Sequence, residues 1–120
     1  MSARVLVADD SSTMRKIILR SLQAVGVPSA VEAGDGEEAV ALFQQSTFDL
    51  VLTDWNMPKK NGLEVIQEIR KLNATVPIIM VTTEAEKTRV LEAIQAGVSD
   101  YLVKPFTADT LRQKLEKFGC

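Results

Sequence analysis

The sequence has no histidine and only one cysteine, Cys120, among its 120 residues. Without histidine, nucleophile pairs that join serine or cysteine to histidine are excluded, and most zinc sites are excluded with them. A single cysteine also excludes a disulfide within the chain, so the fold does not require an oxidising compartment. Any chemistry in this protein must therefore rest on other side chains.

A long apolar run and an excess of positive charge are also missing. No apolar run approaches the ~20 residues needed to cross a membrane, and residues 1–4 lead into strand-like sequence without the apolar core of a signal peptide. The formal net charge of −2 and a pI near 5.2 give no support to nucleic-acid binding. We expect a cytoplasmic monomer that binds neither nucleic acid nor membrane.

The residues that are present are typical of a soluble globular domain, with 46% hydrophobic and 25% charged side chains. Short apolar runs predict buried strands at residues 4–8, 30–33, 50–52, 76–81 and 101–103. Helical spacing predicts a helix after each strand: up to Gly26, over 37–45, from Leu63 to Leu72, over 84–96 and from Thr107 to Phe118. This alternation predicts one α/β domain, 1–120, with a doubly wound parallel sheet covered by helices on both faces.

The expected helices carry apolar stripes that should face the sheet. These stripes include Ile17 in the first helix, Leu72 in the third, and Leu91 and Ile94 in the fourth. Hydroxyl residues at 11–13 offer an N-cap for the first helix, and Thr107 offers one for the last.

Polar side chains follow four of the expected strands, at their carboxyl ends: Asp9–Asp10, Asp54, Thr82 and Lys104. Since the carboxyl ends of parallel strands meet at one edge, these side chains should converge. Carboxylates in one cleft repel each other, and a hard divalent cation such as Mg²⁺ relieves that repulsion. A lysine and a threonine hydroxyl suit phosphoryl oxygens, and one carboxylate could act as the nucleophile that forms an aspartyl phosphate.

Each of these residues also has an ordinary explanation when it is taken alone. Asp9–Asp10 could be a favourable charge pair at a helix N-terminus, and Asp54 could begin a solvated turn. Thr82 could be a simple cap and Lys104 a solvated lysine. The four together favour a functional site.

These motifs resemble the signature of the receiver domain of two-component response regulators. The resemblance covers essentially the whole chain, from Arg4 to Phe118, and is strongest at residues 12–15, 54–58 and 101–107. Within that family the chain looks most similar to the stand-alone chemotaxis regulators. The resemblance implies a flavodoxin-like sheet with strand order 2-1-3-4-5 and five helices, in a single receiver domain.

The resemblance also implies site roles by position. Asp54 would be the phosphoacceptor, receiving its phosphoryl group from a histidine kinase. Mg²⁺ would be bound by Asp10, Asp54 and the main-chain carbonyl of Asn56, with Asp9 helping through water. Lys104 would pair with the phosphoryl oxygens, and the Lys104–Pro105 peptide is expected to be cis. The chain would promote only its own phosphorylation and dephosphorylation, so we do not expect an enzyme.

The implied output is a change in a partner-binding face. Thr82 would hydrogen-bond a phosphoryl oxygen and be coupled to Tyr101, whose ring would turn inward. The implied face consists of Tyr101, Lys87, Val90, Val103, Lys114 and Lys117. Asn56 and Glu84 match positions that set how fast water removes the phosphoryl group. The implied partners, besides the kinase, are a flagellar motor switch protein and a phosphatase.

Two features depart from the family pattern. Thr83 stands where alanine or glycine is common, and we expect it to crowd the phosphoryl pocket or to slow the entry of small donors. The chain ends at Cys120, soon after the last helix, so we expect the output to come from a protein surface rather than from an effector domain.

Three alternatives remain at this point. The chain could be a single-domain receiver in a phosphorelay outside chemotaxis. It could be a hydrolase that forms an aspartyl phosphate, although Asn56 stands where an Asp-x-Asp motif would have its second acid. It could also bind a flavin or nucleotide, although the first strand is followed by Asp9–Ser12 rather than by a glycine-rich phosphate cradle.

Overall fold

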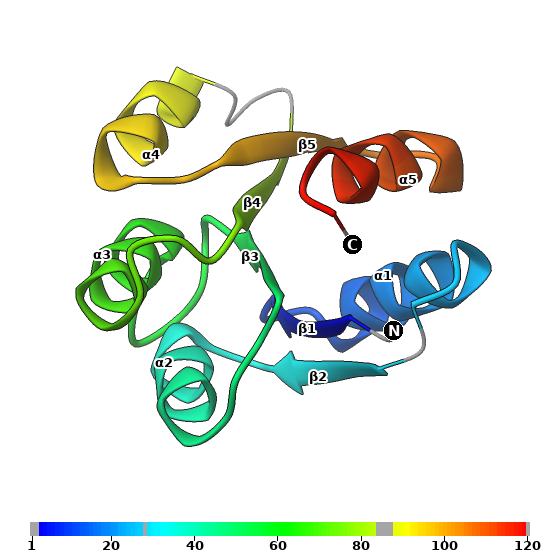
Figure 1. Ribbon diagram of the computed structural model, residues 1–120. Coiled ribbons are helices and arrows are strands. Elements are labelled where there is room, and N and C mark those ends of the chain that lie inside the picture. The colour runs from blue at the N-terminus through cyan, green and yellow to red at the C-terminus, as the bar shows by residue number, and fades with distance from the viewer. Residues whose placement is uncertain (1–2, 28, 84–87, 120) are drawn as a thin grey trace.

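Residues 3–27, 29–83 and 88–119 are described by the computed structural model, and they form five strands that alternate with five helices (Figure 1). The strands are β1 (Arg4–Ala8), β2 (Ser29–Ala33), β3 (Leu50–Asp54), β4 (Ile78–Thr83) and β5 (Asp100–Lys104). The helices are α1 (Ser12–Ala24), α2 (Gly36–Gln45), α3 (Gly62–Leu72), α4 (Val90–Ala96) and α5 (Ala108–Lys117). All strand pairs are parallel and their order is β2-β1-β3-β4-β5. The predicted flavodoxin-like fold is confirmed.

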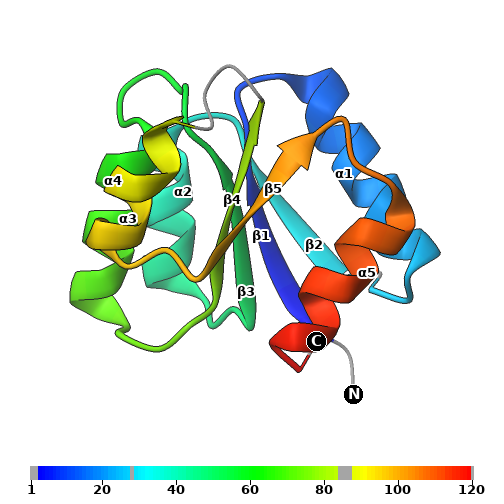
Figure 2. The ribbon, with the colours of Figure 1, turned by 90° about the horizontal axis from the view of Figure 1, so that it is seen from above.

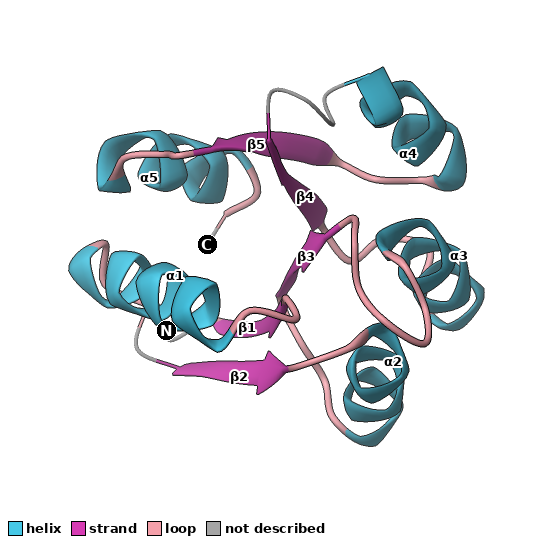
Figure 3. Cartoon of the chain, turned by 180° about the vertical axis from the view of Figure 1, so that it is seen from behind, coloured by secondary structure: helices cyan, strands magenta, loops and turns pink. Residues whose placement is uncertain are grey.

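The helices cover both faces of the sheet. Helices α1 and α5 lie on one face, and α2, α3 and α4 lie on the other (Figures 2 and 3). Successive residues of a strand point to opposite faces, so Val5 and Val7 pack on the α1/α5 side while Leu6 packs on the other. Because both faces of the inner strands β1, β3 and β4 are buried, these strands read as continuous apolar runs rather than as alternating ones. Among the described residues, no helix is long and apolar enough to cross a membrane.

Hydroxyl side chains cap two helices as the sequence predicts. The Ser11 side chain accepts a hydrogen bond from the amide of Met14 at 3.2 Å, which begins α1. The Thr107 side chain accepts one from the amide of Thr110 at 3.1 Å, which begins α5. Each cap satisfies an amide that has no partner within its helix.

The fourth strand lies two residues later than predicted. Val76 is outside the sheet, because its amide donates to the Asn73 side chain at 2.9 Å. Thr82 and Thr83 instead pair in register with Val103 and Lys104 of β5. The predicted range 76–81 is therefore wrong at both ends, and Thr82 belongs to the strand itself.

The predicted stripe of α4 is wrong. Leu91 and Ile94 are 65% and 55% exposed, whereas Val90 and Ala93 face the core. The described part of this helix begins at Val90 rather than at Glu84, and residues 84–87 lie outside the described residues. Where two apolar residues are adjacent, helical spacing does not decide which of them packs.

Two other predicted core residues, Ile17 and Leu72, are also exposed. In α1 the buried residues are Ile18 and Leu22, four residues apart, so Ile17 lies at the edge of that stripe. Leu72 is the last residue of α3, beyond the part of the helix that packs on the sheet.

Candidate functional site

Three carboxylates gather at the carboxyl edge of the sheet. Asp9 and Asp10 follow β1, and Asp54 ends β3, which pairs directly with β1. One carboxylate oxygen from each residue lies within 4.8 Å of the others. Asp9 and Asp54 are only 1% and 7% exposed, whereas Asp10 is exposed. The fold thus brings together the three acids that the sequence singled out.

Lys104 lies between the two buried carboxylates. Its Nζ is 3.2 Å from Asp9 Oδ2 and 3.4 Å from Asp54 Oδ2. Unpaired burial of either carboxylate would be costly, and the ammonium group offsets part of that cost. The following peptide, Lys104–Pro105, is cis as expected.

The alternation of side chains along the strands explains this convergence. Asp9, Asp54 and Lys104 each lie two residues beyond a side chain that packs on the α1/α5 side, namely Val7, Leu52 and Leu102. All three polar side chains therefore extend the same face of the sheet at its carboxyl edge.

Main-chain amides hold the second oxygen of each buried carboxylate. The Trp55 amide donates to Asp54 Oδ1 at 2.7 Å, and the Ser11 amide donates to Asp9 Oδ1 at 2.9 Å. Each carboxylate is thus fixed on one side by the backbone and directs its Oδ2 toward Lys104.

The start of α3 packs closely against the backbone of Asp54 and Trp55. The Gly62 amide, at the start of α3, donates to the Trp55 carbonyl at 2.7 Å. A Cβ at Gly62 would overlap the Asp54 carbonyl oxygen and lie 2.9 Å from the Trp55 Cα. Glycine is therefore required at this position. This requirement was not predicted from the sequence, although the Asn61–Gly62 pair ahead of an apolar stripe indicates a turn there.

Arg15 is a second residue that the sequence analysis missed. Its Nη1 donates to the Asp9 main-chain carbonyl at 2.6 Å, and its Nε pairs with Glu32 at 3.0 Å. The side chain thus ties the end of β1 to β2 beside the carboxylates. No spacing rule connects residues 9, 15 and 32, so only the fold shows this link.

The cluster fits a hard divalent cation. Three carboxylates and one ammonium leave a formal excess of two negative charges, and carboxylate oxygens are ligands that Mg²⁺ favours. Asn56, whose carbonyl was predicted as a further ligand, lies in the exposed loop directly after β3. The donor set is thus suited to Mg²⁺.

The predicted switch residue Thr82 is completely buried in β4. Its hydroxyl donates to the Thr83 carbonyl over a long 3.4 Å. Thr83 is half-buried and lies opposite Lys104 in the register of β4 and β5. Its predicted effect on donor entry stays a prediction. Glu84 lies outside the described residues.

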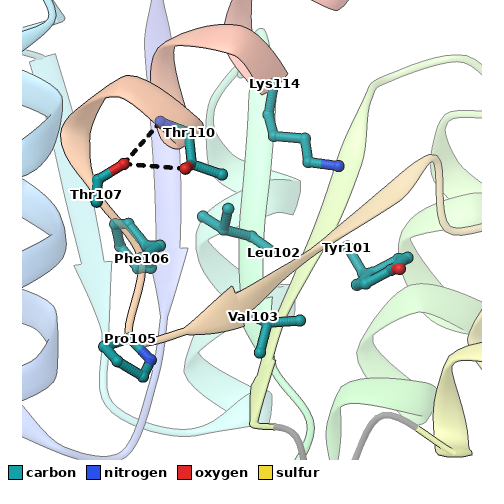
Figure 4. A pocket seen from close by; sticks show the side chains of 8 residues that line it. All are labelled: Tyr101, Leu102, Val103, Pro105, Phe106, Thr107, Thr110 and Lys114. Carbon is teal, nitrogen blue, oxygen red and sulfur yellow. Dashed lines mark hydrogen bonds between the residues drawn. The ribbon is translucent and has the colours of Figure 1, made fainter.

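The predicted partner face spans α4, β5 and α5, and its part on β5 and α5 lies next to a surface pocket of about 250 Å³ (Figure 4). Residues 101–103, 105–107, 110 and 114 line the pocket. Tyr101 and Val103 are half-buried at this face. Val90 is buried in the core, so in this conformation it cannot offer a contact, and Lys87 lies outside the described residues.

The lysines predicted for this face are paired inside the molecule. Lys114 and Lys117 both place Nζ 3.1 Å from the carboxylate of Asp100, the first residue of β5. Burial alone would raise the pKa of the Asp100 carboxyl, but the Tyr101 amide, Lys117 and Lys114 outweigh it and lower that pKa below its ordinary value of 3.8. Asp100 was not among the residues predicted from the sequence for this face.

Known proteins resemble this chain in sequence and in fold. Residues 5–116 match the family described as the response regulator receiver domain. Chemotaxis protein CheY-3 of Vibrio cholerae is 43% identical over 116 residues, which cover 95% of this chain and 89% of that protein. The structure of V. cholerae CheY4 aligns with a TM-score of 0.89 at 35% identity, covering 98% of this chain and 99% of that one.

One further solved structure bears on the acidic cluster. The receiver domain of a sensor histidine kinase from Pseudomonas aeruginosa aligns with a TM-score of 0.89 at 28% identity, covering 98% of both chains. That protein has a magnesium ion coordinated in its active-site cleft. From the match over residues 5–116 and the identity to CheY-3, this chain belongs to the response regulator receiver domain family and is a CheY-like member of it.

Proposed function

We propose that this protein is a two-component response regulator that accepts a phosphoryl group from a histidine kinase on Asp54. The observation that carries the proposal is the setting of that one carboxylate. Asp54 is almost fully buried, its Oδ1 accepts from the Trp55 amide at 2.7 Å, and its Oδ2 lies 3.4 Å from Lys104 Nζ. A charged nucleophile is thus held in one orientation beside a cation that can meet the incoming phosphoryl oxygens.

The proposed transfer needs no other nucleophile. A carboxylate oxygen of Asp54 forms a bond to phosphorus while the bond from phosphorus to the donor's imidazole nitrogen breaks, and the electron pair leaves with the imidazole. Water later attacks the same phosphorus, which releases inorganic phosphate and restores the carboxylate. The protein in this proposal promotes only its own phosphorylation and dephosphorylation, with Asn56 and Glu84 setting the rate of the second reaction.

Mg²⁺ would be held by Asp10, Asp54 and the main-chain carbonyl of Asn56, with Asp9 helping through water. When bound, it would neutralise negative charge on the carboxylates and on the phosphoryl oxygens. The close approach of the three acids supports this assignment, and so does the magnesium ion in the related P. aeruginosa receiver domain.

The proposed output is a shift of the β5–α5 face. Thr82 lies two residues beyond Met80, which pairs in register with Tyr101, so Thr82 and Tyr101 share one face of the sheet. Movement of the Thr82 hydroxyl toward phosphorylated Asp54 would give the Tyr101 ring space to turn inward. Couplings of this kind are typically ~1–3 kcal/mol, so phosphorylation would shift a population rather than lock one state.

We propose chemotaxis as the setting because the relatives are chemotaxis proteins. The partners would then be a histidine kinase, a flagellar motor switch protein and a phosphatase. The same site chemistry would serve a phosphorelay outside chemotaxis, and a pull-down with phosphorylated against unphosphorylated protein separates the two settings.

Substitution of the phosphoacceptor tests the proposal most directly. We expect Asp54→Asn to abolish labelling by a phosphohistidine donor, because an amide is not a competent nucleophile. The matched control is Asp49→Asn, which changes the aspartate immediately before the same strand, where its carboxylate accepts from the Arg4 amide. Intact-mass spectrometry should find the added phosphoryl group in wild type and in Asp49→Asn only. Equal labelling of Asp54→Asn would refute the assignment.

A second variant tests the output. We expect Thr82→Ala to be phosphorylated but to lose most of the gain in motor switch protein binding that a stable acyl-phosphate mimic produces. Thr75→Ala, an exposed threonine near the amino end of the same strand, is the control. Titration of the switch protein should show the full gain in wild type and in the control. The same gain in Thr82→Ala would show that this hydroxyl does not transmit the signal.

A further inference from the structure

Asp100 lies at the centre of a compact ion-pair cluster on the β5–α5 face. Its Oδ1 accepts from the Tyr101 amide at 2.8 Å and from Lys114 Nζ at 3.1 Å, and its Oδ2 accepts from both lysines at 3.1 Å. The Asp100 side chain is only 10% exposed, whereas that of Lys117 is 60% exposed. A carboxylate that accepts from one amide and two ammonium groups thus lies beneath cations that partly face the solvent.

The cluster carries a surplus of positive charge next to the pocket. Two ammonium groups share one carboxylate, and Lys114 Nζ also lies 5.4 Å from the centre of the Tyr101 ring. Figure 4 shows Lys114 reaching from α5 toward Tyr101 at the margin of the pocket. A negatively charged group arriving at this face would therefore meet two lysines that already hold an internal carboxylate.

We propose that Asp100 acts as an internal competitor for Lys114 and Lys117, and that it thereby determines the strength and charge selectivity with which the β5–α5 face binds an acidic segment of a partner protein. The partner's carboxylates would replace Asp100 as the main partner of Lys114 and Lys117. The inference rests on the part of the proposed function that makes β5 and α5 a partner face, and it does not depend on phosphorylation.

Replacing an ion pair of Asp100 by one with a partner's carboxylate costs little free energy. Ion pairs that reach the solvent stabilise a protein by only ~0.2–1 kcal/mol each, so an incoming carboxylate can replace one without a large penalty. Asp100 nevertheless competes with the partner's carboxylates for the two lysines. The Tyr101 amide holds the Asp100 carboxylate in place, and its position in the same chain keeps it close to both lysines. A neutral segment would gain nothing from the lysines, since it would leave their bonds to Asp100 unchanged.

The test uses a fluorescent oligoglutamate peptide as the probe, titrated against unphosphorylated protein. We expect Asp100→Asn to bind it roughly three- to tenfold more tightly than wild type, because one or two internal ion pairs no longer compete. The gain should shrink in ~1 M NaCl, where the Debye length falls to about 3 Å. An oligoserine peptide of equal length should show no gain.

Asp109→Asn is the matched control. Asp109 is an exposed residue of α5 that pairs with Arg112 at 2.9 Å. The change therefore removes the same charge from the helix that carries the two lysines, without removing a partner of either lysine. It should alter the affinity by less than about twofold, in keeping with the small contribution of an exposed pair. Equal tightening in both variants would show an effect of net charge alone and would overturn the proposal.

Two further variants keep the proposal testable. Adding Lys114→Ala and Lys117→Ala to Asp100→Asn should remove the gain, and a gain that persists would overturn the proposal. Lys117→Ala alone removes only a largely exposed side chain, and it should bind the oligoglutamate peptide roughly twofold more weakly than wild type. This comparison tests the proposal even if Asp100→Asn does not fold, and an unchanged affinity would count against it. The same results are expected in an Asp54→Asn background, so a failure of the phosphorylation proposal is distinguishable from a failure here.

Discussion

The two ends of β5 carry charge clusters of opposite composition. At the carboxyl end, Lys104 lies 3.2 Å and 3.4 Å from the carboxylates of Asp9 and Asp54. At the amino end, Asp100 lies 3.1 Å from each of two lysines of α5. The first cluster has too few cations for its carboxylates, and the second has too few carboxylates for its cations. Each surplus points to the charge of the ligand that would complete the cluster.

The two clusters also differ in how far they are removed from water. The acids beside Lys104 are nearly buried, whereas the lysines around Asp100 are partly or largely exposed. Two charges 4 Å apart interact by about 4 kcal/mol at an effective dielectric constant near 20 and by about 1 kcal/mol in bulk water. The charge that would complete the cluster at the carboxyl end of β5 should therefore change the free energy of unfolding more than a charge at the amino end.

Addition of Mg²⁺ should give the largest change. A ligand that binds only the native state raises the free energy of unfolding by about 2.7 kcal/mol at 100 times its dissociation constant. We expect thermal unfolding to move upward with Mg²⁺ and to stay nearly unchanged with NaCl of equal ionic strength. Scanning calorimetry in the two salts is the measurement.

Variants locate the Mg²⁺ effect within the molecule. Asp54→Asn should lose most of the stabilisation by Mg²⁺, whereas Asp100→Asn should keep it. Equal shifts in MgCl₂ and NaCl, or the same loss in both variants, would contradict a metal site among Asp9, Asp10 and Asp54.

Removal of the acid at the amino end should give an intermediate change. We expect Asp100→Asn to lower the free energy of unfolding at pH 7 by about 1 kcal/mol, a small value because the lysines remain hydrated. The pKa of Asp100 is lowered in the folded state. Its contribution is therefore present above the ordinary pKa of 3.8 and is lost as pH falls through the lower folded value. Urea titrations across this range should show wild type and variant converging in acid, and a constant difference would contradict the ionic role.

The smallest change in stability is expected from Asp10→Asn, which should stabilise the metal-free protein rather than destabilise it. Asp10 is exposed and lies close to two other carboxylates, so its removal should relieve repulsion. We expect the metal-free protein to become more stable by about 0.5 kcal/mol. Urea unfolding in EDTA measures this, with Asp109→Asn as a control that should bring no gain. A destabilised Asp10→Asn would argue that the carboxylates do not strain the metal-free fold.

The two clusters also differ in how far they could be predicted from the sequence. Asp9, Asp54 and Lys104 each end or follow an apolar run, and the carboxyl ends of parallel strands meet at one edge. Their convergence therefore follows from local pattern and a general rule of sheets. The caps at Ser11 and Thr107 were predictable for a similar reason, since a cap depends on residues only three positions apart.

Only the tertiary structure placed Asp100 beneath Lys114 and Lys117. These residues lie 14 and 17 positions apart from Asp100 in the chain, and their meeting depends on how α5 packs against β5. The contact of Gly62 with the backbone of Asp54 is of the same kind, because it depends on the distance between a helix and a strand end.

The orientation of α4 was also decided by packing. Val90 and Leu91 are adjacent and both apolar, as are Ala93 and Ile94, so the sequence predicts a helix with an apolar side without choosing between neighbours. The structure turns Val90 and Ala93 inward and leaves Leu91 and Ile94 in solvent. Local pattern determines which residues share a helix face, whereas close packing against the rest of the core determines which face is buried.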